Sequence, residues 1–239
     1  MLHKFSDRVY YSDFDEITNQ PVTGYILGNN YSLLIDSTLS SKSTLRLLKE
    51  IEEAGLRKPD FVMLTHSHWD HTYGLKPLSV PVIANSLTYE YMKKEKSWPW
   101  SNETFKEYRE KGVIEPFIAE HMELEYDDFS KVEIVLPDII YEDQIKLDLG
   151  GVTAIAKKTV NAHSKDGSVI FIPEEKAIFL GDSMYTELVG PDWVDHPELV
   201  EQYYNELSKL DFDTAFPAHT EHISRKQMFS ELKERFLNI

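Results

Sequence analysis

Three histidines and one aspartate lie within six consecutive residues of the stretch THSHWDH, residues 65–71. Neutral imidazoles and carboxylates are the ligands that zinc and similar divalent ions prefer. A compact turn offers few other partners for so many polar side chains, so the grouping indicates a metal site. His66 and His68 can converge on one ion, while Asp70 and His71 project differently round the turn and can serve a neighbouring ion.

A short apolar run, FVML at residues 61–64, precedes the motif and predicts a buried strand. The four polar side chains therefore leave the end of a strand together. A surface histidine cluster is the alternative interpretation. The string His-x-His-x-Asp-His after a strand resembles the signature of the metallo-β-lactamase fold hydrolases. This resemblance implies an α/β fold, the four-layer αβ/βα sandwich, over most of the chain.

Three positions farther along the chain resemble the same superfamily in the expected order. His163 lies in NAHSKDGS (residues 161–168), Asp182 follows the run IFLG (residues 178–181), and His219 lies in FPAHT (residues 216–220). Taken singly, each is an ordinary turn residue or a buried imidazole, but seven matches in order favour ligands. The resemblance implies one metal held by His66, His68 and His163, a second held by Asp70, His71 and His219, and Asp182 as the bridge between them.

Some positions depart from the family pattern or fall outside it. Ala162 and Ala218 stand where the family usually has glycine, which affects loop geometry more than ligand identity. The remaining histidines, His3, His121, His196 and His222, are assigned to the surface or to packing. Of these, His222 has the best claim to a supporting place, because it lies three residues after His219.

Two further residues have a functional and an ordinary interpretation. Asp36, in Asp36-Ser37-Thr38, stands where the family usually shows Asp-Thr-Gly and supports the metal site, although a turn or helix-cap role fits equally. Tyr185 lies three residues after Asp182. It resembles the tyrosine that faces the substrate carbonyl in acyl-homoserine lactonases of the superfamily, so it is a candidate oxyanion donor. Packing at the start of a loop is the alternative.

The expected chemistry is hydrolysis with two divalent ions, zinc first, with iron or manganese as alternatives. Two ions can share a hydroxide, lowering the pKa of water from about 15.7 towards 7. That hydroxide would attack the carbonyl of a small-molecule lactone, ester, thioester or amide, and Asp70 would orient it or take its proton. A phosphodiesterase of the same fold and a non-enzymatic metal-binding or scaffold protein are the alternatives.

Composition restricts the partners. The 239 residues carry a formal charge of −16 and no cysteine, which argues against nucleic acid as a substrate and leaves only His, Asp and Glu as ligands. No apolar run approaches the roughly 20 residues of a membrane span. The N-terminal residues lack the apolar core of a signal peptide, which predicts a cytoplasmic protein. We expect one domain, residues 1–239.

Hydrophobic patterning predicts the elements around the motif. Residues 21–36 alternate in polarity around a turn at residues 28–30, which is typical of a hairpin, and a helical period begins at Ser43. Further strands are predicted at residues 80–84, 144–149, 152–156, 168–172 and 177–180. Helices after Pro197 and Ser224 should cover the second sheet.

Residues 86–131 are rich in Glu, Lys, Tyr and Trp and have a weak helical pattern. Their aromatic residues include Trp98, Trp100, Tyr108, Phe117 and Tyr126. We predict a helical, aromatic-rich segment that covers the substrate or forms an interface, such as a homodimer contact. Packing of the aromatic rings onto the sheet is an equally good interpretation.

Overall fold

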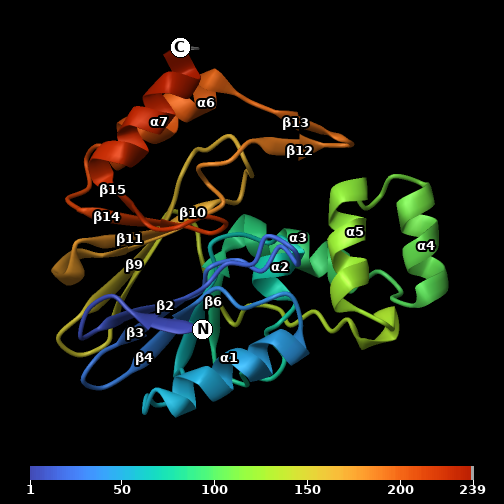
Figure 1. The fold of residues 1–239 in the computed structure, drawn as a ribbon, viewed down its shortest axis with the longest axis horizontal. Coiled ribbons are helices and arrows are strands. Elements are labelled where there is room, and N and C mark those ends of the chain that lie inside the picture. Colours follow the sequence, from blue (N-terminus) through green and yellow to red (C-terminus); the bar gives the residue numbers. More distant parts are fainter. Residues whose placement is uncertain (238–239) are drawn as a thin grey trace.

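Two sheets face each other in the computed structural model, which describes residues 1–237 (Figure 1). The first sheet runs, in spatial order, β1 (Leu2–Lys4), β2 (Val9–Ser12), β3 (Gly24–Leu27), β4 (Ser32–Ile35), β5 (Phe61–Met63), β6 (Val82–Asn85) and β7 (Ile139–Tyr141). The second runs β15 (Ile223–Ser224), β14 (Thr214–Pro217), β11 (Ala177–Gly181), β10 (Ser168–Ile172), β9 (Thr153–Lys158) and β8 (Gln144–Asp148).

Helices cover the outer face of each sheet (Figure 1). On the first sheet these are α1 (Ser41–Glu53), α2 (Trp69–Thr72) and α3 (Ser86–Lys96). On the second they are α6 (Pro197–Leu207) and α7 (Arg225–Leu237), as the sequence predicted. The expected α/β four-layer αβ/βα sandwich is confirmed.

Three hydrophobic layers hold the sandwich together, and single strands contribute to two of them. Successive strand residues point to opposite faces. Leu34 therefore packs under the helices of the first sheet, whereas Ile35 packs between the sheets. In the second sheet Phe179 faces the space between the sheets and Ile178 faces α6 and α7. Because both faces of these strands are buried, they read as continuous apolar runs.

The hairpin and the helix that precede the motif in the chain form close to where the local sequence predicts them. The hairpin predicted at residues 21–36 is β3–β4, in which Gly24 pairs with Ile35. The first helix begins two residues earlier than predicted, because the Ser40 side chain accepts a hydrogen bond from Ser43 N–H and caps it. From β4 to β7 the neighbouring strands are parallel, so their carboxyl ends lie at one edge of the sheet.

Several short elements were not anticipated from the sequence. These are β1, β2, β7 and a separate hairpin of β12 (Glu187–Val189) and β13 (Asp192–Val194). Each has three or four residues, and all but β2 include solvent-exposed positions, so the apolar period of each is too short to recognise. The β12–β13 hairpin projects from the C-terminal helices towards α5 (Pro116–Glu125) (Figure 1).

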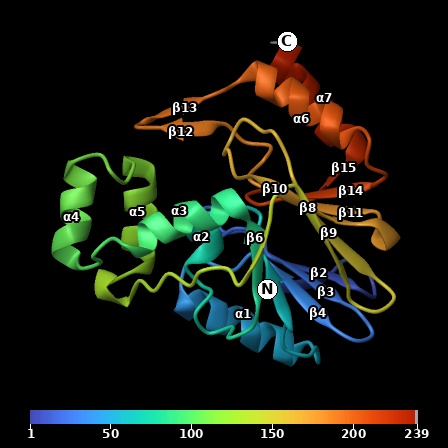
Figure 2. The ribbon, with the colours of Figure 1, turned by 180° about the vertical axis from the view of Figure 1, so that it is seen from behind.

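The segment at residues 86–131 contains α3, α4 (Asn102–Glu110), α5 and the short helix η1 (Phe129–Lys131). Helices α4 and α5 stand side by side at one flank of the molecule (Figure 2). An ion pair between Arg109 and Glu123, 2.6 Å between nitrogen and oxygen, joins them. Ser101 begins α4 with a capping box that includes Thr104.

None of the helices described between residues 1 and 237 is both long and apolar enough to cross a membrane.

Candidate metal centre

The seven predicted ligands come together where strands of both sheets end. The motif at residues 66–71 follows β5, and Asp182 follows β11. His219 follows β14, which is parallel to β11, so these two side chains start from adjacent strand ends. His163 lies in the loop between β9 and β10. The fold thus assembles residues as far apart in the sequence as His66 and His219.

A first group contains His66, His68, His163 and Asp182. His163 Nε2 lies 3.0 Å from His68 Nδ1 and 3.3 Å from Asp182 Oδ2. His66 Nε2 lies 3.7 Å from the same Asp182 oxygen. These are the residues that the resemblance implied for the first metal, with Asp182 as the shared member.

A second group contains Asp70, His71, Asp182 and His219. His219 Nε2 lies 3.3 Å from both Asp70 Oδ2 and Asp182 Oδ1, and His71 Nε2 lies 3.4 Å from Asp182 Oδ1. Asp182 therefore turns one carboxylate oxygen to each group. This is the placement expected of a carboxylate shared by two cations, because each oxygen can meet one of them.

The atoms of both groups fit divalent cations. His66 Nε2, His71 Nε2 and Asp182 Oδ1 are buried and have no hydrogen-bond partner. Such atoms are costly to bury unless a ligand satisfies them. Ligands about 2.0–2.1 Å from a tetrahedral zinc lie about 3.3–3.4 Å from one another, close to most of the distances above. The nitrogen and carboxylate donors also suit zinc, iron or manganese.

Neighbouring groups orient the imidazoles. His163 Nδ1 lies 2.8 Å from the Thr186 carbonyl oxygen, so it carries a hydrogen and leaves Nε2 free to bind. His71 Nδ1 lies 2.9 Å from Asp36 Oδ2, which directs His71 Nε2 towards the second group in the same way. Only His68 presents Nδ1 to its group.

Asp36 has the supporting position that was one of its two predicted interpretations. Its backbone is left-handed, with φ 59°, and its side chain is buried. Besides His71, it accepts hydrogen bonds from Thr65 N–H at 2.7 Å and from Thr65 Oγ1 at 2.7 Å. It therefore ties the end of β4 to the start of the motif.

We expect Asp36→Asn to weaken zinc binding by about 10–100-fold, the usual effect of losing an outer partner of a ligand histidine. The amide keeps the size of the side chain but cannot accept all three bonds. Chelator competition measures the affinity, and thermal unfolding reports on the fold. Asp211→Asn, at an exposed position, is the control. An unchanged zinc affinity in a folded Asp36→Asn protein would contradict this role.

Two residues that position the ligand loops escaped the sequence analysis. Asn161 Oδ1 accepts hydrogen bonds from the backbone N–H groups of His163 and Ser164, which shapes the His163 loop. Asp166 is fully buried and accepts from Ser67 N–H at 2.8 Å, from Thr88, and from Ser164. It joins the motif loop to the His163 loop. Asp and Asn are common in turns for local reasons, so no sequence signal marked these roles.

The pKa values differ between the two groups: carboxylates favour positive charge on the histidines of the second group, whereas burial disfavours it on His66 and His163 of the first. Burial opposes charge on His219, but the carboxylates of Asp182 and Asp70 outweigh it and raise its pKa to about 9. The same two carboxylates and Asp36 outweigh burial at His71 and raise its pKa well above the usual range. Burial lowers the pKa of His163 to about 4. A cation that binds must displace the protons of His71 and His219.

A cavity of about 320 Å³ opens onto both groups. His68, Asp70, His163, Asp182 and His219 line its polar side. Its other walls are mostly apolar or aromatic and come from Trp69, Phe117, Ile118, Leu188 and Trp193, together with Tyr185 and Thr186. The rings of Phe117 on α5 and Trp193 on β13 meet edge to face, with centroids 5.3 Å apart. The cavity therefore lies beneath a contact between two segments distant in the sequence.

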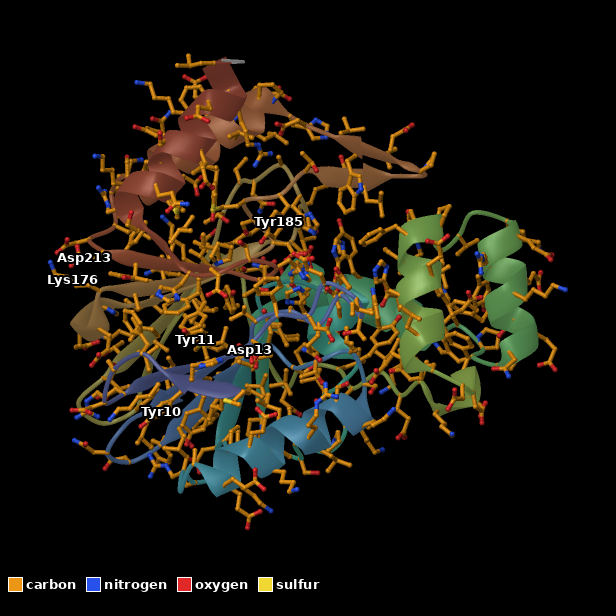
Figure 3. The ribbon with its side chains drawn as sticks, in the orientation of Figure 1. Tyr10, Tyr11, Asp13, Lys176, Tyr185 and Asp213 are labelled. Atoms are coloured by element: carbon orange, nitrogen blue, oxygen red, sulfur yellow. The ribbon has the colours of Figure 1, made fainter. Side chains whose placement is uncertain are left out.

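Tyr185 lines this cavity and lies near the middle of the molecule (Figure 3). Its hydroxyl oxygen accepts a hydrogen bond of 2.9 Å from the backbone N–H of His219. Burial, followed by the charge of Asp182, raises the pKa of Tyr185 well above its usual value, so the phenol keeps its proton. Because the oxygen accepts in that bond, its hydrogen remains available to a molecule in the cavity.

Asn19 is a cavity residue that the sequence analysis missed. Its Nδ2 donates to Asp70 Oδ2 at 3.1 Å, across 51 residues of sequence. Its φ of 60° places it in the left-handed region, which asparagine tolerates better than most residues. Nothing in the local sequence relates this loop to Asp70.

The other histidines lie outside both groups. His222 packs its ring against Phe5, Tyr11 and Phe216, and His3 pairs with Asp13. His196 contacts Glu187 at 2.7 Å, and His121 contacts the Phe117 carbonyl. None belongs to a four-residue ligand group among the described residues.

The chain combines a four-layer αβ/βα sandwich with two His/Asp groups, each of which could hold a metal ion, at the ends of its strands. The family model of the metallo-beta-lactamase superfamily matches residues 18–219, and the chain belongs to this superfamily. The match spans all seven predicted ligands. The resemblance noted in the sequence is therefore confirmed. No curated protein matches the chain.

Solved structures of low sequence identity share the fold. A metallo-beta-lactamase from Pontibacter korlensis has a TM-score of 0.70 at 16% identity, covering 100% of this chain and 99% of that one. A metallo-beta-lactamase family protein from Thermus thermophilus has a TM-score of 0.65 at 17% identity, with 98% and 80% coverage. A double mutant of the sec-alkyl sulfatase PisA1 has a TM-score of 0.70 at 19% identity, covering 98% of this chain and 40% of its own. These likenesses concern the fold.

Proposed function

We propose that the protein is a binuclear metal-dependent hydrolase that cleaves a carbonyl compound, an ester, lactone, thioester or amide, with zinc as the metal. The observation that carries the proposal is the position of Asp182. Its two oxygens face separate groups of buried ligand atoms, and both groups border one cavity. A purely structural site has no need of such a cavity, because it closes its ligand shell.

The bound ions and Asp70 would have different roles in hydrolysis. When bound, two divalent ions would polarise the scissile group and lower the pKa of the attacking water. Burial would raise the pKa of Asp70, but His71 and His219 outweigh it and hold that pKa below the usual range. Asp70 is thus an ionised carboxylate at the cavity wall, suited to orient water or accept its proton.

The cavity walls favour a substrate with an apolar portion beside its carbonyl. Phe117 and Ile118 of α5 and Leu188 and Trp193 of the β12–β13 hairpin would contact that portion. In this proposal residues 86–131 act as a covering segment through α5, while Trp98, Trp100 and Tyr108 pack against one another. The Tyr185 hydroxyl would donate to the developing oxyanion. The partner is a small molecule.

The alternatives are less well supported. A phosphodiesterase would benefit from basic side chains near the phosphate, and the described lining of the cavity contains no lysine or arginine. A non-enzymatic metal-binding protein would hold the same ions without turnover. Metal content cannot separate that alternative from an enzyme, whereas a reaction can.

We expect purified protein reconstituted with zinc to bind close to two equivalents. His163→Ala should lower this content because it removes a first-group ligand, whereas His222→Ala should leave it unchanged because His222 packs outside both groups. Elemental analysis of the dialysed proteins measures the difference. No bound metal in the wild type would disprove the proposed centre.

The reaction is tested by screening the zinc-loaded protein against lactones, esters, thioesters, β-lactams and phosphodiesters. A carbonyl substrate should be hydrolysed, and chelation should abolish turnover. If only phosphodiesters react, the carbonyl assignment is wrong. If two metals bind and none of these substrates reacts, the result favours a non-enzymatic metal-binding protein.

A further inference from the structure

A second cavity, of about 180 Å³, lies behind the first. Both cavities are lined by His68, Trp69 and Ile118, so the two cavities adjoin at these side chains. The second is formed by α2, α5, the end of α3 and the chain that follows α3. The function proposed above makes no use of it.

Aromatic rings form much of its lining. Trp69, Tyr73, Trp98 and Trp100 all contribute. Tyr73 stands nearly perpendicular to Trp100 at a centroid distance of 5.8 Å, and Trp98 is tilted 40° from Trp100 at 6.0 Å. Three of the four rings are therefore in contact with one another along one wall of the cavity. Indole faces attract cations more strongly than other side-chain rings.

The charged groups in the same lining are carboxylates without cationic partners. Glu95 and Glu115 line the cavity, and the described lining has no lysine or arginine. Glu95 accepts a hydrogen bond of 3.2 Å from the Tyr73 hydroxyl, a neutral donor. Burial raises the pKa of Glu95 to about 7, because its desolvation outweighs the opposing effects of the Tyr73 hydrogen bond and the Lys94 charge.

We propose that this cavity binds an organic ammonium group, held against Trp98 and Trp100 and paired with Glu95. A partly buried carboxylate beside aromatic rings is complementary to a bulky, weakly hydrated cation. The cavity adjoins the candidate metal centre, so the ammonium group would belong to the substrate, as in an ester of an amino alcohol. This second step rests on the function proposed above. The alternative is that the Glu95–Tyr73 bond only fastens α3 to α2.

Binding is tested without turnover, by calorimetric titration of the zinc-loaded protein with choline. The matched probe is the uncharged isostere of choline, in which a tert-butyl group replaces the trimethylammonium group. Choline should bind at least about tenfold more tightly than the isostere, because only the cation gains the carboxylate and the ring faces. Equal binding of the two, or no binding of choline, overturns the proposal.

Two variants at the cavity and one control variant test the position of the site. Glu95→Gln keeps the volume and can still accept from Tyr73, so the protein should fold, yet choline affinity should fall about tenfold or more. Glu90→Gln, on the exposed side of the same helix, should bind choline like the wild type. Trp98→Leu should also weaken choline binding by removing an indole face. Wild-type affinity in Glu95→Gln would overturn the assignment.

A pair of esters tests the link to the substrate. The wild type should hydrolyse a choline ester with a kcat/KM about tenfold above that of the isosteric tert-butyl ester, and Glu95→Gln should abolish this preference. Choline binding without any such preference would overturn the substrate role. If neither ester is hydrolysed, the assignment of an ammonium ester as the substrate is wrong, while the substrate screen above still decides the hydrolase proposal and the titrations still decide whether the cavity binds ammonium.

Discussion

Asp70→Asn should lower the turnover of the best carbonyl substrate by about 10²–10⁴-fold, the range for loss of a general base. Asp70 is almost fully buried, and its Oδ2 lies 3.3 Å from His219 Nε2 and 3.5 Å from His71 Nε2. Asparagine has nearly the same shape but cannot accept a proton near neutral pH. The substitution also removes the negative charge of Asp70, which raises the pKa values of His71 and His219 in the wild type.

The metal content distinguishes lost chemistry from a lost site. Asp70 belongs only to the second group, so Asp70→Asn should retain at least the metal held by His66, His68 and His163. Single-turnover kinetics and elemental analysis should be measured on the same preparation. Asp7→Asn, at a nearly fully exposed position, is the control and should leave both unchanged. Wild-type turnover in Asp70→Asn would show that Asp70 has been given the wrong role.

Tyr185→Phe should reduce kcat by about 10²–10³-fold, which corresponds to the roughly 3–4 kcal/mol that one oxyanion donor supplies. The hydroxyl oxygen is fixed by His219 N–H, so its hydrogen is held in the cavity wall before substrate binds. A donor placed in advance stabilises the transition state more than the ground state. The effect should therefore appear in kcat rather than in KM.

The substitution also leaves His219 N–H without its acceptor, so the second metal group must be checked separately. Metal content in Tyr185→Phe should stay at the wild-type level, because no ligand atom is lost. Tyr31→Phe, at an exposed turn, is the matched control. If Tyr185→Phe and the wild type turn over the best ester equally, Tyr185 only packs. The proposed two-metal hydrolase would survive that result.

The candidate metal ligands were readable in the sequence because ligand chemistry depends on residue type and local order. The spacing from His66 to His71 after an apolar run has few structural explanations. The later positions, His163, Asp182 and His219, gained meaning only through the resemblance, because a single histidine or aspartate at a strand end is common. The structure brings all seven into two groups of four, with Asp182 shared.

The layers of the fold were also readable, since buried strands and amphipathic helices leave periodic apolar patterns. The short, partly exposed strands β1, β2, β7, β12 and β13 leave no such pattern. The β12–β13 hairpin was therefore missed, although Leu188 and Trp193 form part of the cavity wall. For the same reason the segment at residues 86–131 could be described only by its composition until α5 was seen beside the site.

The sequence by itself determined the chemistry of the candidate ligands, the class of fold and the local surroundings of each candidate ligand, because these depend on residue type and on neighbours a few positions away. Tertiary structure decided which residues distant in the sequence form hydrogen bonds with the candidate ligands and with the loops that carry them. Asn19 reaches Asp70 across 51 residues, and Asp166 reaches Ser67 across 99. It also decided that Glu95 meets aromatic rings in a cavity beside the centre. Such contacts follow from how whole sheets and helices pack, and packing is a property of the complete core that no local pattern records.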